Sequence, residues 1–113
     1  MTQYRRRPGV VYTQICGEHV LIATGSARDA CAAATRINAA AAAYWQALEQ
    51  PRTLQTLGQA VKEKSGGELR PTPLHTLSFL TRFVSAGFLL AESDGEGEAE
   101  TPPAAQKTTE EKQ

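Results

Sequence analysis

Residues 37–48 read INAAAAAYWQAL, and this stretch decides the fold that the sequence predicts. Asn38 suits the N-cap of a helix because its side-chain oxygen can accept a hydrogen bond from a free amide of the first turn. The alanines after it favour helix. Four apolar residues recur there at helical spacing, namely Ala41, Tyr44, Trp45 and Leu48. We therefore predict a helix over residues 39–49, ended by Pro51, that buries its aromatic pair in the core.

Two more helices are predicted downstream, and each begins at a threonine. Thr53 is expected to cap a helix that continues to about residue 64. Thr72 with Pro73 marks the start of a third helix, because proline is well suited to the first helical position. Gly87 is expected to end that helix, after which the chain returns to the core in an extended form.

Upstream of these helices the sequence predicts strands. Residues 10–15 (VVYTQI) and 19–23 (HVLIA) are rich in β-branched residues, and Gly17 between them favours a hairpin turn. Residues 31–37 are ambiguous because their alanines favour helix, and we interpret residues 33–37 as a short third strand. The order predicts an α+β fold in which a three-stranded antiparallel sheet is followed by three helices, an arrangement similar to a winged helix.

The formal net charge of zero hides two unlike chain ends. Residues 93–113 hold six acids, two lysines and no large apolar side chain, so we expect a disordered acidic tail with a net charge of −4. Residues 1–7 include three consecutive arginines and are expected to be a flexible basic N-terminus. That run could attract nucleic acid or an acidic peptide, but it is short and is explained more simply as solvated. The intervening residues 8–92 suffice for one small domain.

No residue pattern in the chain indicates catalysis, a metal or a cofactor. Cys16 and Cys31 lack CxxC spacing and form no plausible ligand set with His19 and His75, so we interpret them as buried or half-buried thiols. Nucleophile–base patterns, glycine-rich phosphate loops and paired core carboxylates are also missing from the sequence. We predict no catalytic residues, no metal site and no cofactor. Without a signal peptide or a membrane-spanning run, the protein is expected to be cytoplasmic and to have no membrane partner.

Three segments together resemble the PqqD family, whose members are also called RiPP recognition elements. They are residues 37–48, residues 51–57 (PRTLQTL) and residues 79–89 (FLTRFVSAGFL). The first matches the family's aliphatic-Asn step into a helix with an aromatic-Trp pair. The second matches its threonine-hydrophobic step into the next helix, and the third its Phe-Leu helix closed by glycine and two apolar residues. The resemblance covers roughly residues 7–90 and is a pattern of caps and core positions.

The resemblance implies a winged-helix-like fold that binds peptide and is not itself an enzyme. In the family, the leader segment of a ribosomally synthesised precursor peptide pairs as an extra strand with the third strand. Its side chains enter a groove between that strand and the third helix. A partner enzyme, often of the radical SAM type, then modifies the core of the same precursor. The implied partners of this chain are therefore a precursor peptide and a modifying enzyme.

The residues themselves are consistent with such a site. An edge strand presents unpaired amides and carbonyls to another chain, and small side chains without proline allow close approach. The predicted peptide-binding residues are Ala33, Ala34, Thr35, Arg36 and Ile37 on the strand, and Leu77, Leu80 and Phe83 on the third helix. Arg36 could pair with an acidic leader residue or be a solvated charge. The wide apolar sector of the third helix could face a peptide or pack wholly within the domain.

Two other functions stay open at this point. A winged-helix DNA-binding protein needs a polar or basic recognition helix, whereas residues 73–86 carry only Arg82 and His75 as basic side chains. We therefore expect no nucleic-acid partner. A generic interaction domain would use the same edge strand, and pairing of that edge with its own copy would give a homodimer.

Overall fold

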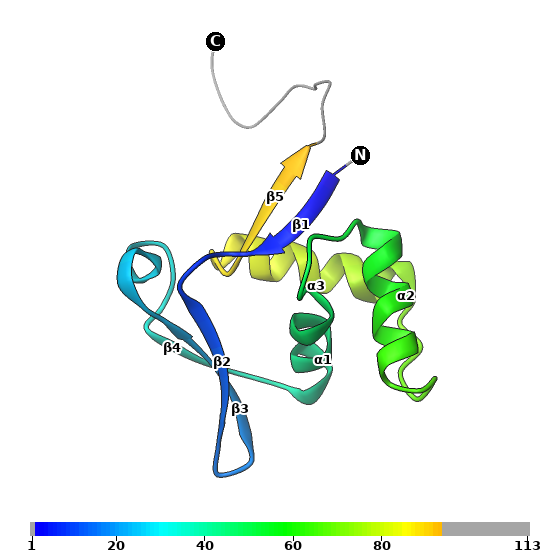
Figure 1. Ribbon diagram of the computed structural model, residues 1–113, viewed down its shortest axis with the longest axis horizontal. Coiled ribbons are helices and arrows are strands. Elements are labelled where there is room, and N and C mark those ends of the chain that lie inside the picture. The colour runs from blue at the N-terminus through cyan, green and yellow to red at the C-terminus, as the bar shows by residue number, and fades with distance from the viewer. Residues whose placement is uncertain (1, 94–113) are drawn as a thin grey trace.

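The structure is a computed structural model that describes residues 2–93 (Figure 1). Along the chain the elements are β1 Thr2–Arg6, β2 Val10–Ile15, β3 Glu18–Ala23, the 3₁₀ helix η1 Gly25–Asp29, β4 Ala34–Ile37, α1 Ala39–Ala47, α2 Leu54–Lys64, α3 Pro73–Ser85 and β5 Leu89–Ser93. The predicted fold class is confirmed: β2, β3 and β4 form a three-stranded antiparallel sheet that is followed by three helices. Figure 1 shows the helices gathered on one side, with this sheet projecting from the other.

Local signals in the sequence account for most element boundaries. Asn38 Oδ1 accepts a hydrogen bond from the amide of Ala41 at 2.8 Å, as expected of an N-cap. Thr53 and Thr72 each close a reciprocal capping box at the start of α2 and α3. The β2–β3 hairpin turns through two residues with positive φ, Cys16 at 52° and Gly17 at 80°, a geometry that matches the twist of the flanking strands.

The core lies where the three helices meet β3 and β5. Its largest fully buried side chains are Trp45, Leu21, Leu48, Leu57, Leu80, Leu89, Val61 and Thr76. The predicted burial of the aromatic pair on α1 is confirmed, since Tyr44 and Trp45 are both buried. The cysteines follow the prediction in part: Cys31 is half-buried, but Cys16 is exposed because it occupies the hairpin turn. Within residues 2–93, no helix has the length and apolar character needed to cross a membrane.

Gly87 ends α3 in a Schellman motif. The amide of Phe88 donates to the carbonyl of Phe83, and the amide of Gly87 donates to the carbonyl of Val84, both at 3.0 Å. The motif requires a left-handed residue, and Gly87 has φ +89°. The same turn lies against the chain that precedes β4, so closely that a Cβ on Gly87 would sit 2.3 Å from the Ala30 carbonyl oxygen. Only glycine therefore fits this junction.

The expectation of a flexible N-terminus over residues 1–7 is wrong for residues 2–6. These residues form β1, which pairs antiparallel with β5 from Thr2 opposite Ser93 to Arg6 opposite Leu89. Tyr4 adds two backbone hydrogen bonds to Arg52, at 2.7 and 3.0 Å. Ser93, expected from the sequence to belong to the tail, is the last residue of β5. The rest of the predicted tail, residues 94–113, lies outside the described residues.

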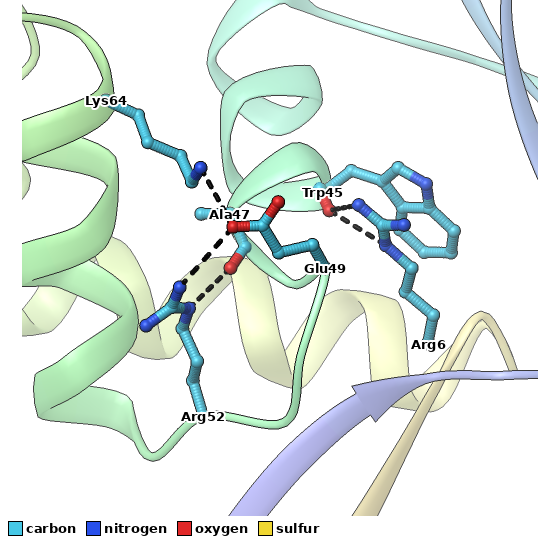
Figure 2. A network of polar contacts seen from close by, with 6 residues as sticks. All are labelled: Arg6, Trp45, Ala47, Glu49, Arg52 and Lys64. Carbon is cyan, nitrogen blue, oxygen red and sulfur yellow. Dashed lines mark hydrogen bonds and ion pairs between the residues drawn. The ribbon is translucent and has the colours of Figure 1, made fainter.

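Two arginines from different parts of the chain close the C-terminal end of α1 (Figure 2). Arg6 donates to the carbonyl oxygen of Trp45 through Nε at 3.0 Å and through Nη2, and its guanidinium lies 5.2 Å from the centroid of the Trp45 ring. Arg52 donates through Nε to the carbonyl oxygen of Ala47. The last carbonyls of a helix lack helical donors and form the negative end of its dipole, so two cations are well placed here.

Glu49 joins these cations to α2. Its carboxylate accepts a hydrogen bond from Lys64 Nζ at 2.9 Å and lies 3.9 Å from Arg52 Nη2 (Figure 2). The hydrogen bond and charge of Lys64 lower the pKa of Glu49. Burial lowers the pKa of Arg6, and the negative charge of Glu49 opposes that effect. Arg7 also donates a hydrogen bond to the Gly87 carbonyl. Two of the three consecutive arginines therefore bond to backbone carbonyls of the domain.

Alanine at Gly87 should cost more than alanine at a similar glycine with open surroundings. Gly66 is the matched control. It follows α2 at φ +68°, and a Cβ added to it would have no other atom within 4 Å. We expect Gly66→Ala to lower the free energy of unfolding by about 1 kcal/mol, from left-handed strain. Gly87→Ala adds displacement of the Ala30 backbone and should cost about 2–4 kcal/mol. Urea denaturation measures both, and equal losses would contradict the close approach.

Neighbouring arginines on β1 should differ in their contribution to stability. Arg6→Ala removes two hydrogen bonds to the Trp45 carbonyl and the contact with its ring, and we expect it to lower the free energy of unfolding by about 1–2 kcal/mol. Arg5→Ala removes only a solvent-exposed ion pair with Glu92, whose loss should cost less than about 1 kcal/mol. Thermal denaturation of both variants tests this, and a larger loss for Arg5→Ala would refute the anchoring role of Arg6.

Candidate functional site

A groove of about 650 Å³ lies between β4 and α3. Three elements and the residue after Gly87 contribute to it. Its lining residues are Thr35, Arg36 and Ile37 from β4, Asn38, Ala40, Ala41 and Tyr44 from the start of α1, His75, Ser78, Phe79, Arg82, Phe83 and Ala86 from α3 and its end, and Phe88. The small side chains at the start of α1 leave this space open between the sheet edge and the third helix.

A chain of aromatic rings forms the floor of the groove. The ring centroids of Tyr44 and Phe79 are 4.6 Å apart, those of Phe79 and Phe83 are 4.3 Å apart, and those of Phe83 and Phe88 are 5.9 Å apart. All four side chains are buried in the core and also line the groove, so they give it a fixed apolar surface. The Tyr44 hydroxyl shares a buried hydrogen bond with Thr76 Oγ1 at 3.0 Å, which fixes the first ring.

One wall of the groove is a free sheet edge. Among residues 2–93, the strand order β2-β3-β4 gives β4 a single neighbour, and the register places Leu21 opposite Thr35 and Ile22 opposite Ala34. The Ala23 amide donates to the Ala33 carbonyl at 3.0 Å, so residue 33 faces β3. In an antiparallel ladder the direction of the backbone groups alternates. The N–H and C=O of Ala34 and of Arg36 therefore point outward, away from β3.

The side chains of β4 alternate in the complementary sense. Thr35 and Ile37 are half-buried and lie on the face that carries Leu21, whereas Ala34 and Arg36 are exposed. Arg36 lies 3.9 Å from Glu18 Oε1, and both side chains are largely in solvent, so this ion pair holds it weakly. The edge thus combines the outward N–H and C=O groups of two residues with one small and one weakly held side chain, and no strand within residues 2–93 pairs with it.

The polar groups that line the groove carry positive charge or are neutral. Within the part of the chain that the structure describes, none of the lining residues is Asp or Glu. Arg82 is exposed and forms no side-chain hydrogen bond or ion pair with any residue in the described range 2–93. His75 Nδ1 accepts a hydrogen bond from the Thr72 amide at 3.4 Å, which belongs to the capping box of α3. Ser78 also lines the groove, but the described residues give it no hydrogen bond to His75 that would activate its hydroxyl.

Some of the site residues predicted from the sequence line the groove in the structure, and others do not. Thr35, Arg36, Ile37 and Phe83 line the groove. The two predicted alanines belong to the strand edge: Ala34 offers an outward amide, and Ala33 is bonded to β3 through its carbonyl. Ala33, the four residues of β4 and Phe83 therefore lie together, at and beside the groove.

The prediction for Leu77 and Leu80 is corrected by the structure, since neither lines the groove. Leu80 is 1% exposed and packs in the core, and Leu77 is 45% exposed on another face of α3. The reason is helical phase: each residue along a helix turns the side chain by about 100°, and α3 packs against the core through Phe79, Leu80 and Phe83. The sequence showed a wide apolar sector but not which part of it packs.

Sequence reasoning missed the contribution of α1 and the polar stripe of α3. Tyr44 was expected in the core, and it is both a core residue and part of the groove floor. His75, Phe79, Arg82 and Ala86 recur at spacings of four, three and four residues, which is one helical stripe. That spacing was available in the sequence, but it combines polar and apolar residues and so gives no amphipathic signal.

Comparison of the chain with protein-family models, with curated proteins and with solved structures found no match. Within residues 2–93, no three His, Cys, Asp or Glu side chains are grouped closely enough to hold a metal ion. The arrangement that the fold does build is a free strand edge beside an aromatic-floored groove, which is suited to binding an extended chain.

Truncation of Leu80 and of Leu77 on α3 should change the free energy of unfolding by different amounts, because one lies in the core and the other on the surface. Leu80→Ala removes a fully buried side chain and is expected to lower the free energy of unfolding by about 3 kcal/mol. Leu77→Ala removes a side chain that is 45% exposed, and alanine favours helix, so we expect a change of less than about 1 kcal/mol. Chemical denaturation distinguishes the two, and similar costs would show that the phase of α3 is wrong.

Proposed function

We propose that the protein is a peptide-binding chaperone. In this proposal it captures the leader segment of a ribosomally synthesised precursor peptide as an added strand on β4, and presents the precursor to a modifying enzyme. The observation that carries the proposal is the outward-facing backbone of Ala34 and Arg36, which lies directly beside the groove. The chain supplies binding, and the partner enzyme supplies the chemistry.

Strand addition uses both parts of this site. Main-chain hydrogen bonds to a free edge provide affinity that is independent of sequence, and alternate side chains of the added strand enter pockets that provide specificity. The other edge of the sheet, β2, also has outward backbone groups, but none of its residues lines the groove. An extended peptide on β4 would bury apolar side chains against the aromatic floor, whereas one on β2 would not.

The resemblance of residues 7–90 to the PqqD family supports the identity of the ligand and the partner. It favours a leader peptide over other extended chains, and a radical SAM enzyme as the kind of enzyme that acts on the precursor. A second copy of the chain is the alternative occupant of the same edge, and it would give a homodimer without any precursor.

Duplex DNA is poorly supported as a ligand. A recognition helix must present polar or basic side chains to the bases. The surface of α3 away from the groove carries Leu74, which is 73% exposed, and Leu77. Its Arg82 and His75 lie on the groove side instead.

Proline on β4 should abolish peptide binding, while proline on β2 should not. Ala34→Pro removes an outward amide from the β4 edge and leaves the bonds to β3 in place. Gln14→Pro is the matched control, because the Thr24 amide donates to the Gly9 carbonyl, so ladder alternation turns the Gln14 amide outward on β2. We would immobilise each full-length chain, pass host lysate over it and identify bound peptides by mass spectrometry. Retention by the native chain and Gln14→Pro, with loss of at least about tenfold from Ala34→Pro, is expected.

Circular dichroism checks that both variants keep their helices. Equal retention of the peptide by Ala34→Pro would reject strand addition on β4. Retention of nucleic acid, or of no peptide at all, would reject the proposed function. A concentration-dependent dimer that dissociates in Ala34→Pro, with no peptide bound, would assign the edge to a second copy of the chain.

A further inference from the structure

Among the described residues, the lining of the groove carries positive charge and no negative charge. Arg82 lines it, and no carboxylate of the described residues 2–93 does. Some cations of the domain are paired with carboxylates, such as Arg5 with Glu92 and Lys64 with Glu49. Arg82 lines the groove and has no such partner among residues 2–93.

The N-terminal end of α1 adds further positive charge to the groove. Ala40 and Ala41 line the groove, and the first turn of α1 contains no acidic residue. The N-terminal end of a helix carries partial positive charge. A carboxylate placed between α1 and α3 would therefore meet favourable charge from the arginine of α3 and from the helix end, without repulsion from any lining residue.

The aromatic floor sets a second requirement on the ligand. Phe79, Arg82 and Phe83 all line the groove, and the two rings are buried whereas the Arg82 side chain is exposed. In an added strand, every second side chain points to the same face. Neighbouring groove-facing side chains, two residues apart, would therefore meet the aromatic rings and the guanidinium of Arg82 in turn.

We infer that the groove selects an extended peptide in which an acidic side chain lies two residues from a bulky apolar one, with Arg82 as the residue that determines this specificity. The inference rests on the proposed function, since it requires a strand on β4. The intervening residue of such a peptide points to the opposite face of the sheet, and the exposed side chain of Arg36, only weakly paired with Glu18, alternates to that same face although Arg36 borders the groove. That position therefore also accepts an acid.

A phage-displayed library of random dodecapeptides tests the inference without knowledge of the natural ligand. The library is selected on the native full-length chain, on Arg82→Glu, on Arg28→Glu and on Ala34→Pro. Arg28 is an exposed arginine of η1 that does not line the groove, so its reversal changes net charge by the same amount elsewhere. The native chain and Arg28→Glu should enrich Asp or Glu two residues from an aliphatic or aromatic residue, whereas Arg82→Glu should lose that acid or replace it with Lys or Arg.

The best peptide from the native selection is then synthesised with its acid and with the matching amide. We expect the amide peptide to bind the native chain about fivefold more weakly and to show no such loss on Arg82→Glu. Failure of the native chain to enrich any peptide that Ala34→Pro rejects would overturn the proposed function itself. Peptides that need the β4 edge but lack acids, or acids that persist on Arg82→Glu, would overturn the charge selection alone.

Discussion

The close approach at Gly87 is the constraint on which the groove depends. The left-handed residue ends α3 and sends Phe88 back onto Phe83, whose rings are 5.9 Å apart. The same turn receives hydrogen bonds from Arg7 and from Cys31 Sγ, the latter at 3.2 Å. It therefore joins the end of α3 to the chain that leads into β4, and this junction holds the two walls of the groove at a defined separation.

The structural features that depend only on neighbouring residues could be predicted from the sequence. Asn38, Thr53 and Thr72 begin the helices through bonds to amides three residues away, so the residue type alone marks each start. The β2–β3 hairpin likewise depends on neighbouring residues. The strand β1 was missed because its partner lies at the other end of the domain, and TQYRR has no alternation that would announce a strand. Its arginines were expected to be solvated, whereas Arg6 and the adjacent Arg7 bond to backbone carbonyls.

The candidate site was predictable at the strand but not at the helix. An edge strand with small side chains is visible in residues 33–37, and the structure places that edge beside the groove. The helical wall depends on how α3 rotates against α1, which is set by the contact of Phe79 with Tyr44, 35 positions earlier in the chain. Packing between distant helices fixes that rotation, and periodicity within α3 does not contain it. Leu80 was therefore placed in the groove, while Phe79 and Arg82 were not.

The pairing of β1 with β5 brings Thr2 opposite Ser93, so the two ends of the described chain leave the molecule side by side. Figure 1 places them far from the turn of the β2–β3 hairpin. A second protein domain tethered through either end would thus start from one point on the surface. Its effective concentration at the groove would be governed by the length of the tether and not by which end carries it. A domain joined before Thr2 and a domain joined after Ser93 would therefore begin at nearly the same place on the surface.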